Sequence, residues 1–193
     1  MINKFILASA SPRRKELLEL VGLEFDVVPG NVDEAFHETE TPRDHVMRLS
    51  REKALAVIAM HPDAWVLGAD TIVLVSGEIL GKPQTKDEAR EMLRKLSGRA
   101  HRVISGFTVL KKTGGAVFTD AVESTVVFKK LSADEIEWYV GTDEPYDKAG
   151  GYAAQGMGAS LIREIRGSYT NVVGLPLCEV VDALRQMGAA KIC

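Results

Sequence analysis

Residues 5–14 read Phe5-Ile6-Leu7-Ala8-Ser9-Ala10-Ser11-Pro12-Arg13-Arg14. The apolar run at the start of this stretch predicts a short buried strand. Ser11 is a favourable residue for the N-cap of a helix, and the fixed backbone of Pro12 suits the first helical position. We therefore expect a strand, a turn of small residues, and then a helix from Pro12 to Val21 that ends before Gly22.

The beginning of this helix carries the chemistry of an anion-binding site. Free backbone N–H groups at a helix N-terminus attract anions, and Ser9 and Ser11 add hydroxyl groups. Arg13 and Arg14 add planar guanidinium groups that match phosphate oxygens. The local pattern fits a loop with two solvated arginines equally well, so both interpretations stay open at this point.

The composition is typical of a globular protein of one large or two small domains. The chain has 193 residues, of which 46% are hydrophobic and 26% are charged. The net charge of −3 gives no long-range attraction for nucleic acid or for an anionic membrane. We expect neither a membrane span nor a signal peptide, because the apolar stretches are short and two arginines follow the first one. Cys178 and Cys193 form no metal motif and favour a reducing compartment, so we expect a cytoplasmic protein.

The rest of the chain alternates helical and β-rich segments. Helical patterns cover residues 42–60, 86–96, 133–140 and 176–187, and strand patterns cover residues 25–29, 65–75, 100–111, 116–129 and 159–165. Residues 77–83 predict a hairpin, residues 167–174 a turn-rich loop, and Thr85–Glu88 and Ser132–Glu135 two capping boxes. His101 and Arg102 are expected on the surface, at the start of a strand. The order predicts a mixed α/β fold, with a twisted sheet flanked by helices. We expect a single domain over residues 1–193, either undivided or split into two lobes around a central cleft.

Asp70 is the strongest functional candidate that the residues themselves provide. It interrupts the nearly continuous apolar segment Trp65–Val75. A buried carboxylate is unfavourable unless it is paired, so Asp70 needs a cation partner or an opening to solvent. Gly68 and Ala69 leave room for a ligand to approach. A purely structural buried ion pair is the alternative interpretation.

The positions of two further charged residues, Lys53 and Glu34, bear on a candidate site. Lys53 follows Leu49 by four residues and precedes Val57 by four, so it falls on the apolar line of its helix. Such a lysine either extends its ammonium to the edge of the core or points it into a site. Glu34 lies in an acidic loop, for which solvation is the default.

Several familiar motifs are absent from the sequence. The segment around Lys82 differs from a P-loop in its spacing and carries Pro83 in place of the hydroxyl residue. Residues 156–158 are too short for a dinucleotide fingerprint, and the four histidines show no metal-ligand spacing. These observations disfavour zinc chemistry and acyl transfer.

Six segments resemble motifs of the Maf family, the septum-formation-inhibitor-like nucleoside triphosphate pyrophosphatases. In chain order they are Leu7–Arg14, Gly68–Thr71, Gly81–Pro83, Leu96–Gly98, Asp147–Gly150 and Gly167–Leu177. They span nearly the whole chain in the order in which the family has them.

The resemblance implies hydrolysis of a nucleoside triphosphate to the monophosphate and pyrophosphate. It implies that Asp70 is the catalytic base, a metal ligand or both, and that Glu34 is a second ligand of a divalent cation, Mg²⁺ or Mn²⁺. The implied phosphate-binding residues are Ser9, Arg13, Arg14, Lys53 and Lys82.

The loop over residues 147–156 and the segment 167–169 resemble the subgroup that prefers dTTP and UTP. Arg13, Thr71 and Gln155 match positions associated there with substrate choice. A Gln amide offers one donor and one acceptor group, which suits O4 and N3–H of uracil or thymine. An amide can also flip and serve cytosine, so something must fix its orientation. The expected substrates are dTTP, UTP and modified pyrimidine nucleotides.

Three alternatives stay open. They are a non-catalytic nucleotide-binding regulator of cell division, a nucleic-acid-binding module, and a pyrophosphatase of the same family with another base preference. The negative charge disfavours nucleic acid, and Glu34, Lys53, Asp70 and Lys82 together favour turnover. We expect a nucleoside triphosphate as the partner, without nucleic acid or membrane, and leave a homodimer open.

Overall fold

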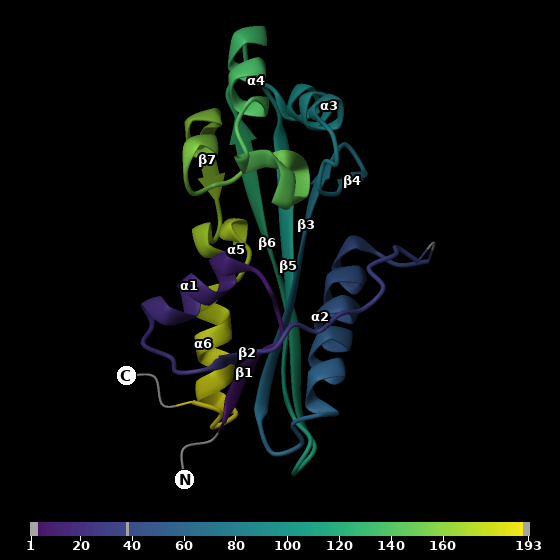
Figure 1. Ribbon diagram of the computed structural model, residues 1–193, viewed down its shortest axis with the longest axis vertical. Coiled ribbons are helices and arrows are strands. Elements are labelled where there is room, and N and C mark those ends of the chain that lie inside the picture. Colours follow the sequence, from purple (N-terminus) through teal and green to yellow (C-terminus); the bar gives the residue numbers. More distant parts are fainter. Residues whose placement is uncertain (1–3, 38, 191–193) are drawn as a thin grey trace. The chain divides into compact units, whose positions relative to one another are not determined.

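The computed structural model describes residues 4–37 and 39–190 as a mixed sheet with helices packed against it (Figure 1). The strands are β1 (Phe5–Leu7), β2 (Asp26–Val27), β3 (Trp65–Val75), β4 (Glu78–Leu80), β5 (Ala100–Lys111), β6 (Ala116–Phe128) and β7 (Ile162–Arg166). The helices are α1 (Pro12–Leu20), α2 (Pro42–Ile58), α3 (Lys86–Leu96), α4 (Ala133–Val140), α5 (Tyr169–Val173) and α6 (Leu177–Gln186). Three short 3₁₀ turns, η1 (Glu144–Asp147), η2 (Ala149–Gly151) and η3 (Met157–Leu161), lie between α4 and β7.

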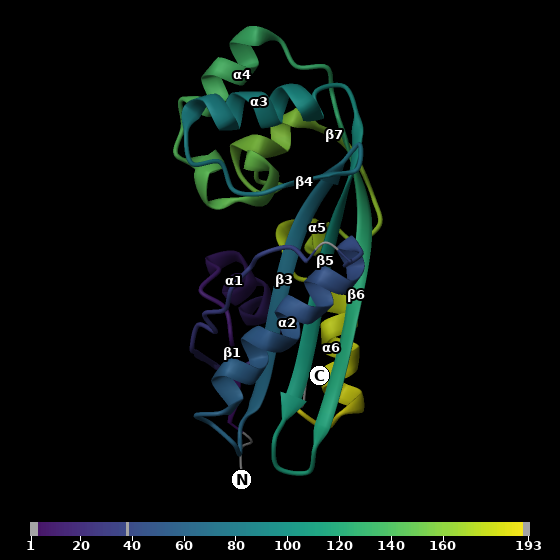
Figure 2. The ribbon, with the colours of Figure 1, turned by 90° about the vertical axis from the view of Figure 1, so that its right-hand side faces the viewer.

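The sheet contains both parallel and antiparallel pairs, as the sequence predicts. The strand order is β2-β1-β3-β5-β6-β7, and β4 pairs with β3 outside this path. Strand β1 is parallel to both of its neighbours, with Leu7 opposite Val27 on one side and Leu67 on the other. Strands β4 and β7 pair antiparallel with β3 and β6. Strands β5 and β6 form a long hairpin, which is visible in Figure 2.

The described residues form two compact units that share strands β3, β5 and β6. Unit 1 is drawn from Met1–Asp70, Ser105–Val122 and Gly174–Cys193, and unit 2 from Thr71–Ile104 and Glu123–Val173. The mixed sheet flanked by helices is confirmed, whereas the single domain over residues 1–193 stays a prediction.

Unit 1 has helices on both faces of its part of the sheet. Helix α2 lies against one face, and α1 and α6 lie against the other (Figures 1 and 2). Apolar side chains fill the space between the sheet and α2; they include Ile6, Ala54, Val57, Val66 and Leu110. The long apolar stripe of α2 explains why this helix forms and which face it buries.

Unit 2 is built around α3 and α4, which contact each other and lie side by side in Figure 2. Its core contains Val73, Leu93, Phe128, Tyr139 and Leu161. The capping box of α4 is confirmed, because Ser132 and Glu135 each accept a backbone N–H from the other. In α3 the Thr85 hydroxyl caps Glu88 N, but the Glu88 carboxylate accepts from Gln84 N instead of Thr85 N.

Most predicted boundaries agree with the structure within two residues. The strand expected over 159–165 begins at Ile162, because Met157–Leu161 turns as η3. The loop expected over 167–174 contains the short helix α5, whose start is stabilised by the Ser168 hydroxyl accepting from Asn171 N at 3.2 Å.

The expectation that His101 lies on the surface is wrong. His101 is 2% exposed, and its Nε2 lies 2.7 Å from the Tyr152 hydroxyl. Arg102 is exposed as expected and forms an ion pair with Glu123. The two neighbours differ in exposure because successive side chains of a strand point to opposite faces of the sheet. Burial lowers the pKa of His101 from 6.5 to about 4.

The buried His101 makes stability depend on pH in a defined window. Its pKa is lowered in the folded state, so the unfolded chain takes up the proton first as the pH falls. This contribution to stability is fully present above pH 6.5 and is lost progressively towards pH 4. Thermal unfolding midpoints between these limits should fall more steeply for the natural protein than for His101→Phe. His37→Gln, which changes an exposed histidine, is the control and should show the same pH dependence as the natural protein. If the unfolding midpoints of His101→Phe and the natural protein fall equally with pH, His101 is not the group responsible.

Candidate active site

Lys53 lies at the centre of a charged cluster in unit 1. Its ammonium Nζ is 2.7 Å from Asp70 Oδ1 and 2.6 Å from Glu34 Oε1. The side chains of Lys53 and Asp70 are each 10% exposed, whereas that of Glu34 is 56% exposed. The cation partner that the sequence demands for Asp70 is therefore Lys53, and two carboxylates converge on one ammonium.

A close approach of α2 to β3 brings Lys53 to Asp70. A Cβ atom at Gly68 would lie 2.1 Å from the carbonyl oxygen of Ser50, so the helix backbone rests directly on the strand. Asp70 follows Gly68 by two residues and shares its face of the strand. Lys53 follows Ser50 by three residues and shares its side of the helix. The missing side chain at position 68 thus sets the distance across which the ion pair forms.

Arg14 is buried and connects three segments of unit 1. Its Nε donates to Gly174 O at 2.9 Å, and its Nη1 donates to Ala69 O at 2.8 Å and to Ser9 Oγ at 3.0 Å. Burial lowers the pKa of Arg14, and the negative charge of Asp70 opposes that shift. Arg14 therefore ties the turn after β1 to the residue that precedes Asp70.

Ser9 is buried in the turn between β1 and α1. Its Oγ accepts hydrogen bonds from Arg14 Nη1 and from Ser11 N, the latter at 3.3 Å. Ala8 N donates to Leu67 O at 2.8 Å, which extends the pairing of β1 with β3 up to this turn. Arg13 is half-buried in the first turn of α1. The turn thus lies at the carboxyl end of a parallel strand, where α/β folds bind ligands.

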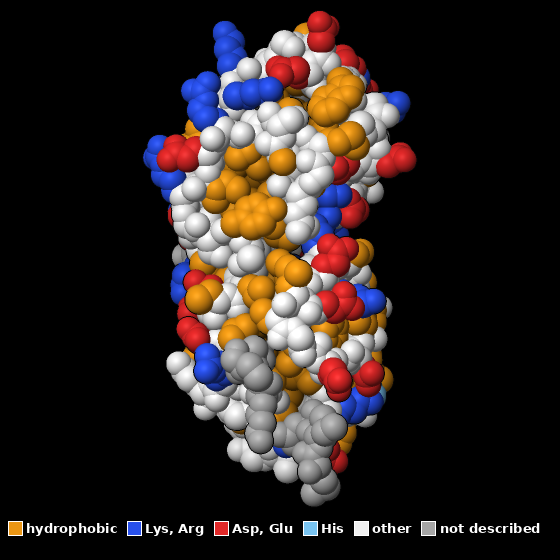
Figure 3. Space-filling view, turned by 90° about the vertical axis from the view of Figure 1, so that its left-hand side faces the viewer, with side chains coloured by type: hydrophobic (Ala, Val, Ile, Leu, Met, Phe, Trp, Pro, Cys, Tyr) orange, Lys and Arg blue, Asp and Glu red, His pale blue; other side chains and the backbone are white. Residues whose placement is uncertain are grey.

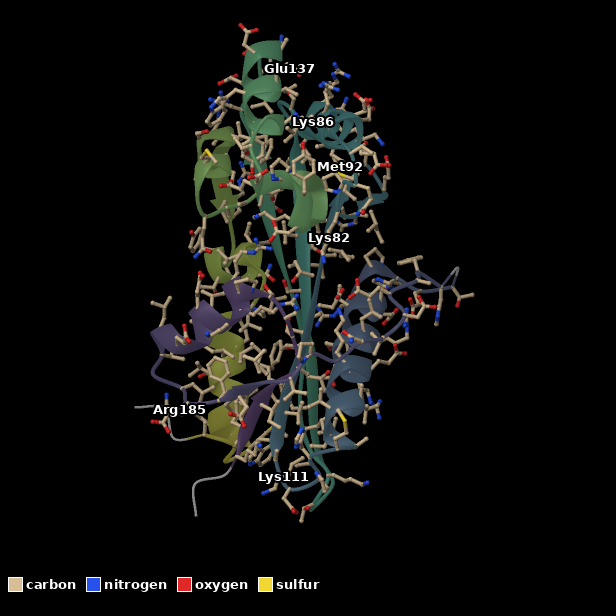
Figure 4. All side chains as sticks on the ribbon, in the orientation of Figure 1. Lys82, Lys86, Met92, Lys111, Glu137 and Arg185 are labelled. Carbon is tan, nitrogen blue, oxygen red and sulfur yellow. The ribbon has the colours of Figure 1, made fainter. Side chains whose placement is uncertain are left out.

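Three of the predicted site residues belong to unit 2. Thr71 follows Asp70 directly in β3 and is half-buried. Lys82, labelled in Figure 4, is exposed on the segment that follows β4. Gln155 is half-buried in the loop between η2 and η3. The contacts described above therefore unite Ser9, Arg14, Glu34, Lys53 and Asp70, with Arg13 adjacent in the chain.

Sequence reasoning missed a second polar network, which holds the loop that carries Glu34. Arg48 Nη2 donates to Ala35 O at 2.9 Å and to Glu40 Oε2 at 3.1 Å, and Arg48 Nε also bonds Glu40. His45 Nδ1 lies 3.1 Å from Glu40 Oε2. Hydrogen bonds from Arg48 lower the pKa of Glu40 to about 2. No local pattern predicts these contacts, because they join α2 to a loop without regular structure.

Metal ligands in this cluster are limited to the carboxylates of Glu34 and Asp70. Within residues 4–37 and 39–190, no group of three or more Asp, Glu, His or Cys side chains is placed to hold a metal ion. An ion at this site would therefore need further oxygen ligands from a substrate or from water.

The surface drawn in Figure 3 carries acidic and basic side chains in the same regions. Interspersed charges of both signs give no extended field of one sign on this face. In the described part of the chain, no helix has the length and apolar character to cross a membrane.

The chain matches the family model described as Maf-like protein over residues 4–187. Its curated relatives include a dTTP/UTP pyrophosphatase of Syntrophus aciditrophicus (strain SB), with 58% identity covering 98% of this chain and 92% of the relative. Another protein of that name, from Geotalea uraniireducens (strain Rf4), is 55% identical over 98% of this chain and 97% of its own.

Solved structures include a similar fold. A HAM1 protein from Coxiella burnetii aligns with a TM-score of 0.52 over 95% of this chain and 99% of that chain, at 15% sequence identity. At this identity the likeness concerns the fold alone, and it agrees with the mixed α/β architecture described above.

The contact at Gly68 can be tested by adding one methyl group. Gly68→Ala should lower the free energy of unfolding by about 1–3 kcal/mol, because α2 must move away from β3. Gly81→Ala is the matched control, since a Cβ atom at Gly81 meets nothing within 4 Å. Urea unfolding of both variants measures the difference, and equal stabilities would contradict the packing described here.

Proposed function

Because this chain belongs to the Maf family, we propose that it hydrolyses dTTP and UTP to the nucleoside monophosphate and pyrophosphate. The observation that carries the proposal is the convergence of Asp70 and Glu34 on Lys53, next to the Ser9–Arg14 turn. The names of the relatives support the choice of substrates. The cytoplasm is the proposed compartment, because a chain with two cysteines and no disulfide framework in its sequence is typical of a reducing environment.

Binding of the triphosphate is assigned to positively charged side chains and to one hydroxyl group. Arg13, Lys53 and Lys82 supply positive charge for the phosphate oxygens. Both lone pairs of the Ser9 hydroxyl accept hydrogen bonds, so its hydrogen can be donated to a phosphate oxygen. Arg14 acts through Ser9 in this assignment, since its Nε and Nη1 bond groups of the protein.

The carboxylates of Glu34 and Asp70 are suitable ligands for a divalent cation. Glu34 and Asp70 each place one carboxylate oxygen against the Lys53 ammonium, so the two carboxylates lie close together. Mg²⁺ is usually bound by one or two carboxylates together with substrate phosphates. We assign Mg²⁺ or Mn²⁺ to these two residues. Such an ion, when bound, neutralises negative charge on the phosphate oxygens.

The reaction requires a base beside the attacking water. The water oxygen forms a bond to the α-phosphorus, and the bond from that phosphorus to the bridging oxygen breaks, so that pyrophosphate leaves. Asp70 is the assigned base, and its second carboxylate oxygen takes the proton from water. Lys53 holds the carboxylate in place by its bond to Oδ1.

Base recognition is assigned to Gln155, with Arg13 and Thr71 contributing to substrate choice. The Gln155 amide donates to O4 and accepts from N3–H of uracil or thymine. The 5-methyl group of thymine is worth only about 1 kcal/mol of apolar contact, so both bases are accepted.

One panel of substrates tests this proposal. Steady-state kcat/KM should favour dTTP and UTP over CTP, ATP and GTP by at least ~100-fold, because the wrong base leaves polar groups unpaired. Turnover should require Mg²⁺ or Mn²⁺ and disappear in EDTA. Preference for CTP or a purine nucleotide would overturn the proposed base preference. Turnover in EDTA would overturn the proposed requirement for a divalent cation. The absence of pyrophosphate release from every substrate would favour a non-catalytic regulator.

Asp70→Asn should reduce kcat by at least ~10²-fold, because the amide keeps the shape of the side chain but cannot accept the proton. Asp26→Asn, which alters an exposed carboxylate of the same unit, is the control and should keep its activity. Circular dichroism and thermal unfolding verify that both variants are folded. Near-normal turnover by folded Asp70→Asn would exclude Asp70 as the base.

A further inference from the structure

The loop that carries Gln155 is held by two side chains outside it. Ala153 N donates to the Tyr139 hydroxyl at 3.0 Å. Met157 N and Gly158 N donate to the Glu144 carboxylate at 3.0 and 2.8 Å. Gln155 lies midway between these anchors, two residues after the first and two before the second.

The two anchoring side chains are also bonded to each other. The Tyr139 hydroxyl donates to Glu144 Oε1 at 2.8 Å, so one continuous network joins helix α4, turn η1 and the loop. We call this network the Tyr139–Glu144 clamp. Burial acts to raise the pKa of Glu144, but the hydrogen bonds from Gly158 N, Met157 N and the Tyr139 hydroxyl, together with the charge of Lys148, outweigh it, so the pKa lies below its ordinary value. The ionised carboxylate is the form that accepts all of these bonds.

The backbone next to Gln155 is shaped around the clamp. Gly156 has a φ of 86°, in the region that favours glycine, and a Cβ atom there would lie 2.5 Å from Glu144 Oε2. At the start of the loop, the hydroxyl of Tyr152 lies 2.7 Å from His101 Nε2. The loop is therefore held at its start, at Tyr152 and Ala153, and at its end, at Met157 and Gly158.

The surrounding elements have supports of their own. The Ser132 capping box stabilises the beginning of α4, and the Tyr139 ring is fully buried in the core of unit 2. Turn η1 is also held by Lys148 Nζ, which donates to Glu144 O at 2.7 Å. The clamp thus holds the loop on both sides of Gln155, while α4 and η1 also have contacts outside the clamp.

We propose that the Tyr139–Glu144 clamp is the positioning device through which Gln155 selects uracil and thymine over cytosine. The inference rests on the proposed function, because it takes Gln155 as the residue that reads the base. An amide distinguishes the two base edges only while its donor and acceptor stay at fixed points. A loop that shifts lets the same amide meet either edge.

A double-mutant cycle tests this coupling. The variants are Glu144→Gln, Tyr139→Phe, Gln155→Ala and the double variant Glu144→Gln/Gln155→Ala. The measurement is the ratio of kcat/KM for UTP to that for CTP. Glu144→Gln and Tyr139→Phe should each lower this ratio by about 10-fold or more, because displaced recognition groups lose discrimination. In the Gln155→Ala background, Glu144→Gln should change the ratio no further.

Glu137→Gln is the matched control. Glu137 lies on α4, is labelled in Figure 4, and pairs with Arg90 instead of the loop. This variant should keep the ratio of the natural protein.

The proposal is overturned if folded Glu144→Gln keeps the ratio, or if it lowers kcat/KM for UTP and CTP equally, as a merely structural residue would. A further fall of the ratio in the double variant also overturns it. If Glu144→Gln does not fold, Tyr139→Phe decides the question, because the ring keeps its place in the core. Failure of the proposed function is distinguishable, since the natural protein would then release no pyrophosphate from UTP or would not prefer UTP to CTP.

Discussion

The ion pair between Lys53 and Asp70 is the interaction on which the arrangement of unit 1 depends. An ammonium and a carboxylate that are both largely withdrawn from water are unfavourable unless they meet. Their meeting requires α2 to rest on β3 at one register, which the bare backbone at Gly68 permits. The loop that bears Glu34 then reaches the same ammonium, so the packing of a helix on a strand also assembles the charged cluster.

Neighbouring residues can have opposite roles for a simple geometric reason. Arg13 and Arg14 have the same chemistry and the same local helix propensity, but successive residues of an α-helix point about 100° apart. One guanidinium is therefore buried among carbonyl oxygens of the protein, while the other is half-buried. Arg14 therefore orders the turn through its bonds to the main chain, whereas Arg13 has a different environment although it is the next residue in the sequence.

The parts of the structure that depend on local patterns could be predicted from the sequence. Strands β3 and β5 were predicted to the residue, because apolar runs bounded by turn residues define them. The capping box at Ser132 fixed the start of α4 in the same way. The need of Asp70 for a cation also followed from the sequence, since a carboxylate in an apolar strand must be compensated. The sequence did not specify the identity of the partner, the burial of Arg14 and His101, or the contacts of Glu40 and Glu144. The pairing of Asp70 and the burial of Arg14 and His101 depend on segments far apart in the chain, whose approach no periodicity reveals. The contacts of Glu40 and Glu144 join residues closer in the chain, but they involve irregular segments for which no local pattern exists.

The Glu144 carboxylate grips main-chain N–H groups, so its bonds contain nothing of the side chain at position 155. The shape of the loop and the identity of its central residue are thus encoded by different parts of the sequence. Under the proposed function, a substitution at position 155 would change the base that is recognised, and the bonds that hold the loop would remain. A change of base preference would then need a substitution at one position and no change in the residues that support the loop.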